Sequence, residues 1–186
     1  MRTFLAVTPP IELARELFKS RVPLRNAWSG VRWVKPENFH ITLIFLGEQD
    51  EALVKKIRKA VFMALVGIKD FEITLNGAGS FGPVSRPKVF IERVEKGREE
   101  LEILRSAICY RLESPADCEQ GRYRPHLTLG RSRRRGLKGP AGGGLLPPEV
   151  KTENLRTFPA GEVILYQSIL QPEGVQYIRL ESWRLH

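Results

Sequence analysis

Two periods of apolar and polar positions run along the chain and predict its strands and helices. Short apolar or alternating runs, bounded by glycine, proline or asparagine, are typical of strands. We expect strands at residues 2–7, 32–35, 39–46, 71–75, 87–94, 123–129, 161–170 and 175–185. Pro172-Glu173-Gly174 is a turn signal between the last two, which predicts a hairpin.

Apolar residues spaced three or four apart predict three helices. The first begins at Ile11 and is limited by Pro23, and the second follows Asp50, a candidate N-cap, and stops at Gly67. The third occupies residues 101–112. Loops are expected at residues 77–83, 114–121 and 132–148, with a short helix after Pro148.

Strands and helices interleave, but hairpins are frequent. This order favours an α+β fold with antiparallel pairing over a doubly wound parallel sheet. A weak internal duplication accompanies it, because an apolar strand, a helix and a histidine-bearing strand occur in that order in each half of the chain. The repeat distance is about 86 residues, the separation of His40 and His126.

Two of the three histidines begin the same short motif. The two copies are His40-Ile41-Thr42-Leu43 and His126-Leu127-Thr128-Leu129. Residues i and i+2 of a strand share a face, so each histidine projects with its threonine. If an approximate twofold relates the halves, the two strands lie side by side and both pairs face one cleft.

Such a group can act on a phosphate ester. One histidine can take a proton from water while the other gives a proton to the departing oxygen. The threonine hydroxyls and Arg131 can hold the non-bridging oxygens. A single histidine on an apolar strand is more often a core residue, but the duplicated motif favours the catalytic interpretation. A metal site would need a third ligand, which the spacing does not supply, so we expect no metal.

The positive net charge of the chain indicates an anionic partner. The chain of 186 residues has 30 Lys and Arg against 21 Asp and Glu, a formal net charge of +9. Seven basic residues and no acid lie between residues 122 and 138, beside the second motif. The RNA contacts that this run and nearby aromatic residues suggest are Arg133, Arg134, Arg135, Phe81 and Tyr123. For Phe45 and Trp33, core packing is favoured over stacking on a base.

The two cysteines indicate the redox state of the cellular compartment in which the protein is found. Cys109 and Cys118 form no CxxC or Cys/His cluster, so we expect neither a disulfide nor a zinc site, and Cys109 should lie in the core. A reducing, cytoplasmic compartment follows. The N-terminal apolar run is too short for a signal peptide, and no segment is long enough to span a membrane.

The motifs and their flanks resemble the paired HxTx motifs of the 2H phosphoesterase superfamily. Within it they are most similar to the bacterial and archaeal RNA 2′,3′-cyclic phosphodiesterases, historically called 2′-5′ RNA ligases. The resemblance extends over nearly the whole chain and is carried by residues 2–7, 32–38, 40–47, 79–82 and 126–131. One departure is Gly130, where the family usually has alanine, and this glycine is expected to loosen Arg131.

The resemblance implies a single domain, residues 1–186, of two lobes. Two antiparallel sheets flanked by helices would face each other across a central cleft, with HxTx strands at residues 39–47 and 123–131. It also implies hydrolysis of RNA 2′,3′-cyclic phosphate ends to 2′-phosphomonoesters. We expect a monomer and no cofactor. His40 would be the proton donor and His126 the proton acceptor, while Thr42 and Thr128 would hold the phosphate.

Two other functions fit the same residues. One is RNA ligation, the reverse reaction, which joins a 2′,3′-cyclic end to a 5′-hydroxyl. The other is an RNA-binding module that holds phosphate ends without turnover.

Overall fold

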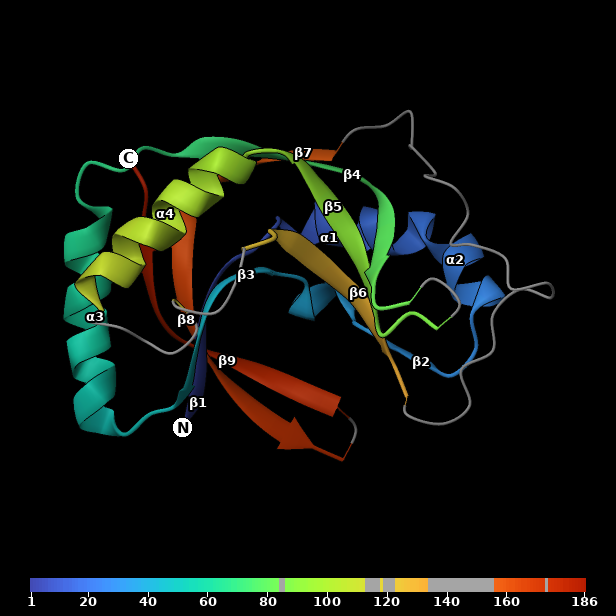
Figure 1. Ribbon diagram of the computed structural model, residues 1–186, viewed down its shortest axis with the longest axis horizontal. Helices are drawn as coiled ribbons and strands as arrows, with labels where there is room; N and C mark the ends of the chain where they lie inside the picture. The colour runs from blue at the N-terminus through green and yellow to red at the C-terminus, as the bar shows by residue number, and fades with distance from the viewer. Residues whose placement is uncertain (84–85, 113–117, 119–122, 134–155, 173) are drawn as a thin grey trace.

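The computed structural model describes residues 1–83, 86–112, 118, 123–133, 156–172 and 174–186 (Figure 1). The predicted contacts Arg134 and Arg135 lie outside these residues, as do most of the predicted loop 132–148, the short helix after Pro148 and all but Cys118 of the loop predicted at 114–121.

The strands of the described residues form one antiparallel sheet of nine strands, which confirms the α+β class. Its order is β7-β4-β5-β6-β3-β1-β8-β9, with β2 paired to β6. The strands are β1 (Arg2–Val7), β2 (Val31–Trp33), β3 (Ile41–Glu48), β4 (Phe71–Phe81), β5 (Val89–Lys96), β6 (His126–Ser132), β7 (Arg156–Ala160), β8 (Glu162–Gln171) and β9 (Gly174–Arg184).

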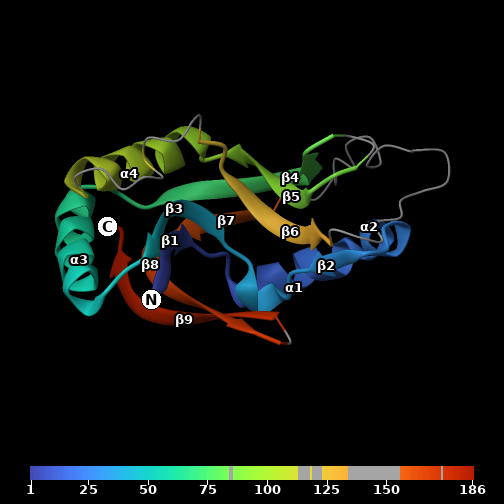
Figure 2. The same ribbon diagram turned by 60° about the horizontal axis from the view of Figure 1, so that its bottom comes forward.

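The sheet consists of two halves that meet at its centre. One half is β7-β4-β5-β6 and the other is β3-β1-β8-β9. A single residue pair, Ile41 with Leu127, joins β3 to β6, and the halves diverge on either side of it (Figures 1 and 2). The two halves therefore belong to one continuous sheet rather than to two separate sheets.

Three of the four helices in the described residues lie against the half of the sheet that does not contain the strand before them. The helices are α1 (Ile11–Ser20), α2 (Val22–Ala27), α3 (Glu51–Leu65) and α4 (Arg98–Arg111), with a 3₁₀ turn at Pro36–Asn38. Helices α1 and α2, which follow β1, lie against the half that contains β5 (Figure 1). There Arg21 forms a buried ion pair with Glu92, and the ring of Trp28 lies 5.2 Å from that of Phe90. Helix α4 follows β5 but packs against the half that contains β3, together with α3, which follows β3 itself.

Local signals placed most helix ends correctly. The Asp50 side chain accepts a hydrogen bond from the Leu53 amide at 2.8 Å and caps α3, as predicted. Gly67 follows α3 with a positive φ of 80°. Helix α2 was not expected, because Pro23 was interpreted as the end of α1. Proline is compatible with the first turn of a helix, and Pro23 occupies that position in α2.

Two strands differ from the prediction. The glycine-rich segment after Leu75 was expected to be a loop, but β4 continues through it to Phe81. The Arg93 side chain lies close to Gly79: a Cβ at this position would be 2.8 Å from Nε of Arg93. Strand β7 was not predicted. Among the described strands it pairs with β4 alone, and Pro159 fits such an edge strand.

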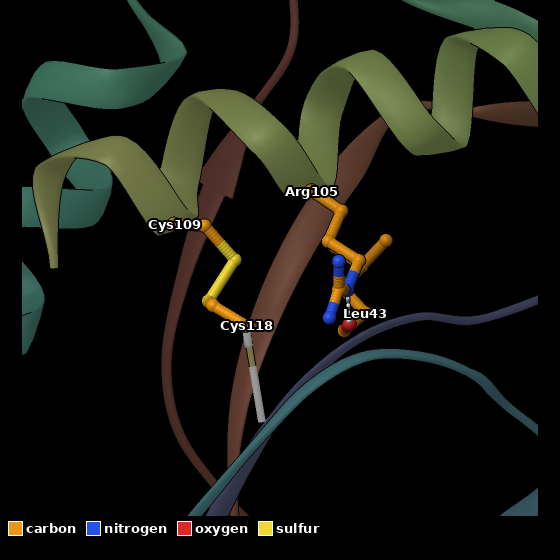
Figure 3. Close-up of a disulfide and its surroundings, with 4 residues drawn as sticks. All are labelled: Leu43, Arg105, Cys109 and Cys118. Carbon is orange, nitrogen blue, oxygen red and sulfur yellow. Dashed lines mark hydrogen bonds between the residues drawn. A yellow bond between two sulfur atoms is a disulfide. The ribbon is translucent and has the colours of Figure 1, made fainter. Parts of the chain in front are cut away.

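The expectation of no disulfide is wrong. Cys109, on α4, is bonded to Cys118, and their Cα atoms are 5.8 Å apart (Figure 3). Cys118 follows Cys109 by nine residues, and the distance between their Cα atoms is within the range that a disulfide requires. Cys109 is half-buried beside the core rather than within it. Disulfides also occur in intracellular proteins of hyperthermophiles, so the bond is compatible with either compartment.

Candidate active site

Both motif strands contain a bulge at the leucine of His-x-Thr-Leu. On β3, Thr42 pairs with Ala6 and Ile44 pairs with Leu5, which leaves Leu43 as the extra residue. The register of β6 shifts in the same way, because Thr128 pairs with Ile91 and Gly130 with Phe90, and Leu129 is left over. The duplication therefore extends to an irregularity of the backbone.

The bulge changes which side chains share the face of the histidines. Without it, residues three apart would lie on opposite faces of the strand. With it, Arg131 lies on the face of Thr128, because their partners Val89 and Ile91 are two residues apart on β5. Phe45 takes the equivalent place on β3 and is 53% exposed. The core role favoured for Phe45 is therefore wrong.

The central pair of the sheet brings the two motifs together. Ile41 and Leu127 are fully buried and point away from the site. Extending their antiparallel register by one residue in each direction places His40 beside Thr128 and His126 beside Thr42. The four side chains that the sequence singled out thus converge on one face, with a histidine and a threonine from each half.

The two imidazoles are held in the same way. Nδ1 of His40 lies 2.8 Å from the carbonyl oxygen of Asn38, and Nδ1 of His126 lies 2.7 Å from that of Arg124. A carbonyl only accepts, so Nδ1 carries the hydrogen in both rings and donates it. The nitrogen left for proton transfer is Nε2 in each case.

The surroundings lower the pKa of both histidines. Burial is the largest cause for His40, and the nearby positive charges of Arg131 and His126 add to it, so that its pKa falls to about 4. Burial and Arg131 also lower the pKa of His126. Hydrogen bonds to the carbonyls of Asn38 and Arg124 oppose the two shifts. Both rings are therefore neutral at pH 7 in the free protein.

Aromatic rings fix the positions of the histidines. The ring of His40 lies 4.9 Å from that of Phe4 and 5.1 Å from that of Tyr177, which meets it edge-on. Phe81 meets His126 in the same edge-on manner at 4.8 Å. Phe81, predicted as an RNA contact, thus lies in the site. Phe4 and Tyr177 were missed, because no local sequence signal connects Tyr177 with a histidine 137 residues away.

Tyr123 and Arg105 hold β3 where it separates from β6. The Tyr123 hydroxyl donates to the carbonyl of Thr42 at 3.0 Å. Nε of Arg105 donates to the carbonyl of Leu43 at 3.2 Å (Figure 3). Buried carbonyls need a donor, and these side chains supply one beyond the last pair between β3 and β6. Tyr123 has this structural contact beside the RNA contact predicted for it.

The end of β6 carries the basic residues of the site. Arg131 and Arg133 are exposed, and the positive charge of Arg131 acts on both histidines. Gly130 has a steric reason to be glycine, besides the looser Arg131 that was expected. A Cβ there would lie 2.7 Å from the Trp33 ring and 2.8 Å from Val31, so these side chains occupy the space of a methyl group.

The described residues contain no group of three or more His, Cys, Asp or Glu side chains arranged to hold a metal ion. In the same part of the chain, no helix is long and apolar enough to cross a membrane.

Comparisons with known proteins show which family the chain resembles. Residues 7–91 match the model of the family described as LigT like Phosphoesterase. An RNA 2′,3′-cyclic phosphodiesterase of Methanothermobacter thermautotrophicus is 31% identical over 100% of this chain and 99% of its own. One of Archaeoglobus fulgidus is 32% identical over 95% and 96%.

The fold also has solved relatives. A crystal structure of a Thermus thermophilus protein superposes with a TM-score of 0.77 and 26% identity, and covers 100% of this chain and 98% of that one. Full-length similarity above 30% to the two phosphodiesterases, together with the paired motif strands, identifies the chain as a member of the LigT-like phosphoesterase family of the 2H superfamily.

Proposed function

We propose that this protein is an RNA 2′,3′-cyclic phosphodiesterase that hydrolyses the cyclic end to a 2′-phosphomonoester without a metal ion. The observation that carries the proposal is the meeting of the two motifs at Ile41 and Leu127, with Nδ1 of each histidine bonded to a carbonyl. This geometry offers two Nε2 atoms from opposite halves to one phosphate. The names of the full-length relatives supply the substrate class.

The reaction assigns one proton transfer to each histidine. Nε2 of His126 accepts a proton from water as the water oxygen attacks phosphorus. The bond from phosphorus to the 3′ oxygen breaks, and Nε2 of His40 donates a proton to that oxygen. The products are a 2′-phosphate and a free 3′-hydroxyl, with one proton taken up and one released by the protein.

The donor must gain its proton when substrate binds. His40 is neutral at pH 7 in the free protein, because its pKa is lowered to about 4. A cyclic phosphate diester carries one negative charge, and an anion beside an imidazole raises the pKa of that imidazole. The substrate thus helps to protonate its own general acid.

The remaining polar groups stabilise the phosphate. Thr42 and Thr128 lie on the face of the histidines, where their hydroxyls can donate to the non-bridging oxygens. Arg131 shares this face through the bulge at Leu129 and supplies a positive charge.

The test is turnover of a short oligoribonucleotide that ends in a 2′,3′-cyclic phosphate, in buffer containing EDTA. We expect the wild-type protein to form a 2′-phosphate product. Replacement of either catalytic histidine, His40→Ala or His126→Ala, should lower kcat by about 10²- to 10⁴-fold, since each removes a general acid or base.

His186→Ala is the matched control, because it removes the third histidine, which is exposed at the end of the chain. It should retain wild-type turnover. Turnover that EDTA abolishes would contradict metal independence, and turnover that survives either catalytic substitution would contradict the acid-base pair.

A further inference from the structure

A groove of about 590 Å³ extends from the active site between the end of β6 and the β8–β9 hairpin. One wall is formed by β2 and the residues around it, together with the end of β6, and it carries Arg32, Lys35 and Arg133. The hairpin forms the other wall with Gln171 and Gln176. Figure 2 shows β2 and the end of β6 above the projecting hairpin.

Three residues belong to both the groove and the active site. Asn38 accepts the His40 hydrogen bond through its carbonyl and donates from Nδ2 to the Val175 carbonyl at 3.1 Å. Tyr177 packs edge-on against His40, and the charge of Arg131 acts on Tyr177 as well as on the histidines. All three line the groove, which therefore lies next to the catalytic histidines.

The lining suits a polyanion. Within the described residues it contains four cationic side chains, counting Arg131, and no acidic one. Arg32, Lys35 and Arg133 are exposed, and none of them forms an ion pair within the part of the chain that the structure describes. Positive charge along one wall can follow a phosphate backbone, while glutamine amides can hydrogen-bond to bases or sugars.

We infer that this groove binds the nucleotides on the 5′ side of the cyclic phosphate, with Arg32, Lys35 and Arg133 on their phosphates. The inference rests on the proposed function. A 2′,3′-cyclic phosphate ends its chain, so the rest of the RNA extends only from the 5′ oxygen of the terminal nucleoside. That strand must leave the active site by an open path, and the groove is a basic path that begins beside Asn38 and Tyr177, which both contact His40.

The experiment compares two substrates that share a terminal nucleoside. One is a nucleoside 2′,3′-cyclic phosphate, and the other is a tetranucleotide that ends in the same group. We expect a lower KM for the tetranucleotide. Arg32→Ala and Lys35→Ala should each raise the KM of the tetranucleotide and leave that of the mononucleotide unchanged. The ratio of the mononucleotide KM to the tetranucleotide KM should therefore fall by about two- to fivefold, the usual size of an exposed charge contact. Each variant should also lower the slope of log KM against log salt for the tetranucleotide by about 0.7.

Lys55→Ala is the matched control. It removes one exposed positive charge from α3, at the other end of the molecule from β2 (Figure 1). This variant should keep the wild-type KM ratio. Equal KM values for the two substrates in the wild-type protein, or equal losses on both substrates in the groove variants, would overturn the groove assignment and leave the proposed function intact. Absence of turnover on both substrates would overturn the proposed function and the groove with it.

Discussion

At the scale of single residues, His40 and His126 share a backbone contact but not an environment. Each donates from Nδ1 to the carbonyl of the residue two positions earlier. His40 packs between Phe4 and Tyr177, whereas His126 has Phe81 at its edge. Such differences in burial and charge are how a protein assigns distinct protonation states to chemically identical side chains.

The charge of Arg131 leads to a titration prediction. In the free protein, NMR should find a midpoint near 4 for the His40 ring, against an ordinary pKa of 6.5. The variant Arg131→Ala should titrate at a higher pH, because a positive charge that opposes protonation is gone. A bound nucleoside 2′-phosphate should also raise the midpoint. A free-protein midpoint at about 6.5 would contradict this account.

The same lowered pKa sets the direction of the pH dependence of stability. Folding lowers the pKa of His40, so the unfolded chain binds the proton first as the pH falls. The contribution of His40 to stability is complete above pH 6.5 and is lost as the pH falls toward about 4.

At the scale of elements, the sequence showed which strands carry the chemistry but not how their faces are arranged. Strict alternation puts Thr128 and Arg131 on opposite faces, and only the bulge at Leu129 brings them together. A bulge depends on pairing with a distant strand and has no signature within His-x-Thr-Leu itself. The same dependence explains why Phe45 was expected in the core, and why β7, an edge strand beside β4, was not predicted.

The disulfide at the end of α4 gives a stability prediction. It closes a loop across a sequence separation of nine, and such a cross-link reduces the entropy of the unfolded chain. Reduction by a dithiol, or the substitution Cys118→Ser, should lower the free energy of unfolding by about 2–3 kcal/mol in urea titrations.

The double variant Cys109→Ser/Cys118→Ser serves as the control, since reductant has no bond to break in it. Its unfolding curve should be the same with and without the dithiol. If the dithiol also left the unfolding curve of the wild-type protein unchanged, the disulfide would not contribute to stability.

At the scale of the whole molecule, the duplicated sequence did predict two related halves. The succession of most strands and helices along the chain follows from periodicity and from turn and cap residues, and the paired motifs are visible in the sequence itself. The exchange of helices between halves could not be predicted, because periodicity shows that a helix has an apolar face but not which sheet surface covers that face. The basic run pointed to one wall of the groove, whereas Arg32 and Lys35 joined it only through the pairing of β2 with β6.

The exchanged helices predict that the halves unfold together. One hydrophobic cluster includes Leu5 of β1 and Phe90 of β5 as well as residues of α1, α3 and α4. Native-state hydrogen exchange should therefore give the same opening free energy for the amides of Leu5 and Phe90. A clearly lower value for one of them would show that its half opens separately.

The two bulges also bear on regiochemistry. A cyclic phosphate has two ester oxygens, O2′ and O3′, and a site with true twofold symmetry would bind the ring equally well in either orientation. The bulges place corresponding residues on the reactive face, but one half presents the cation Arg131 and the other presents the aromatic ring of Phe45. A duplicated backbone with unequal side chains at one matched position can thus distinguish the two oxygens, and so select which ester bond breaks.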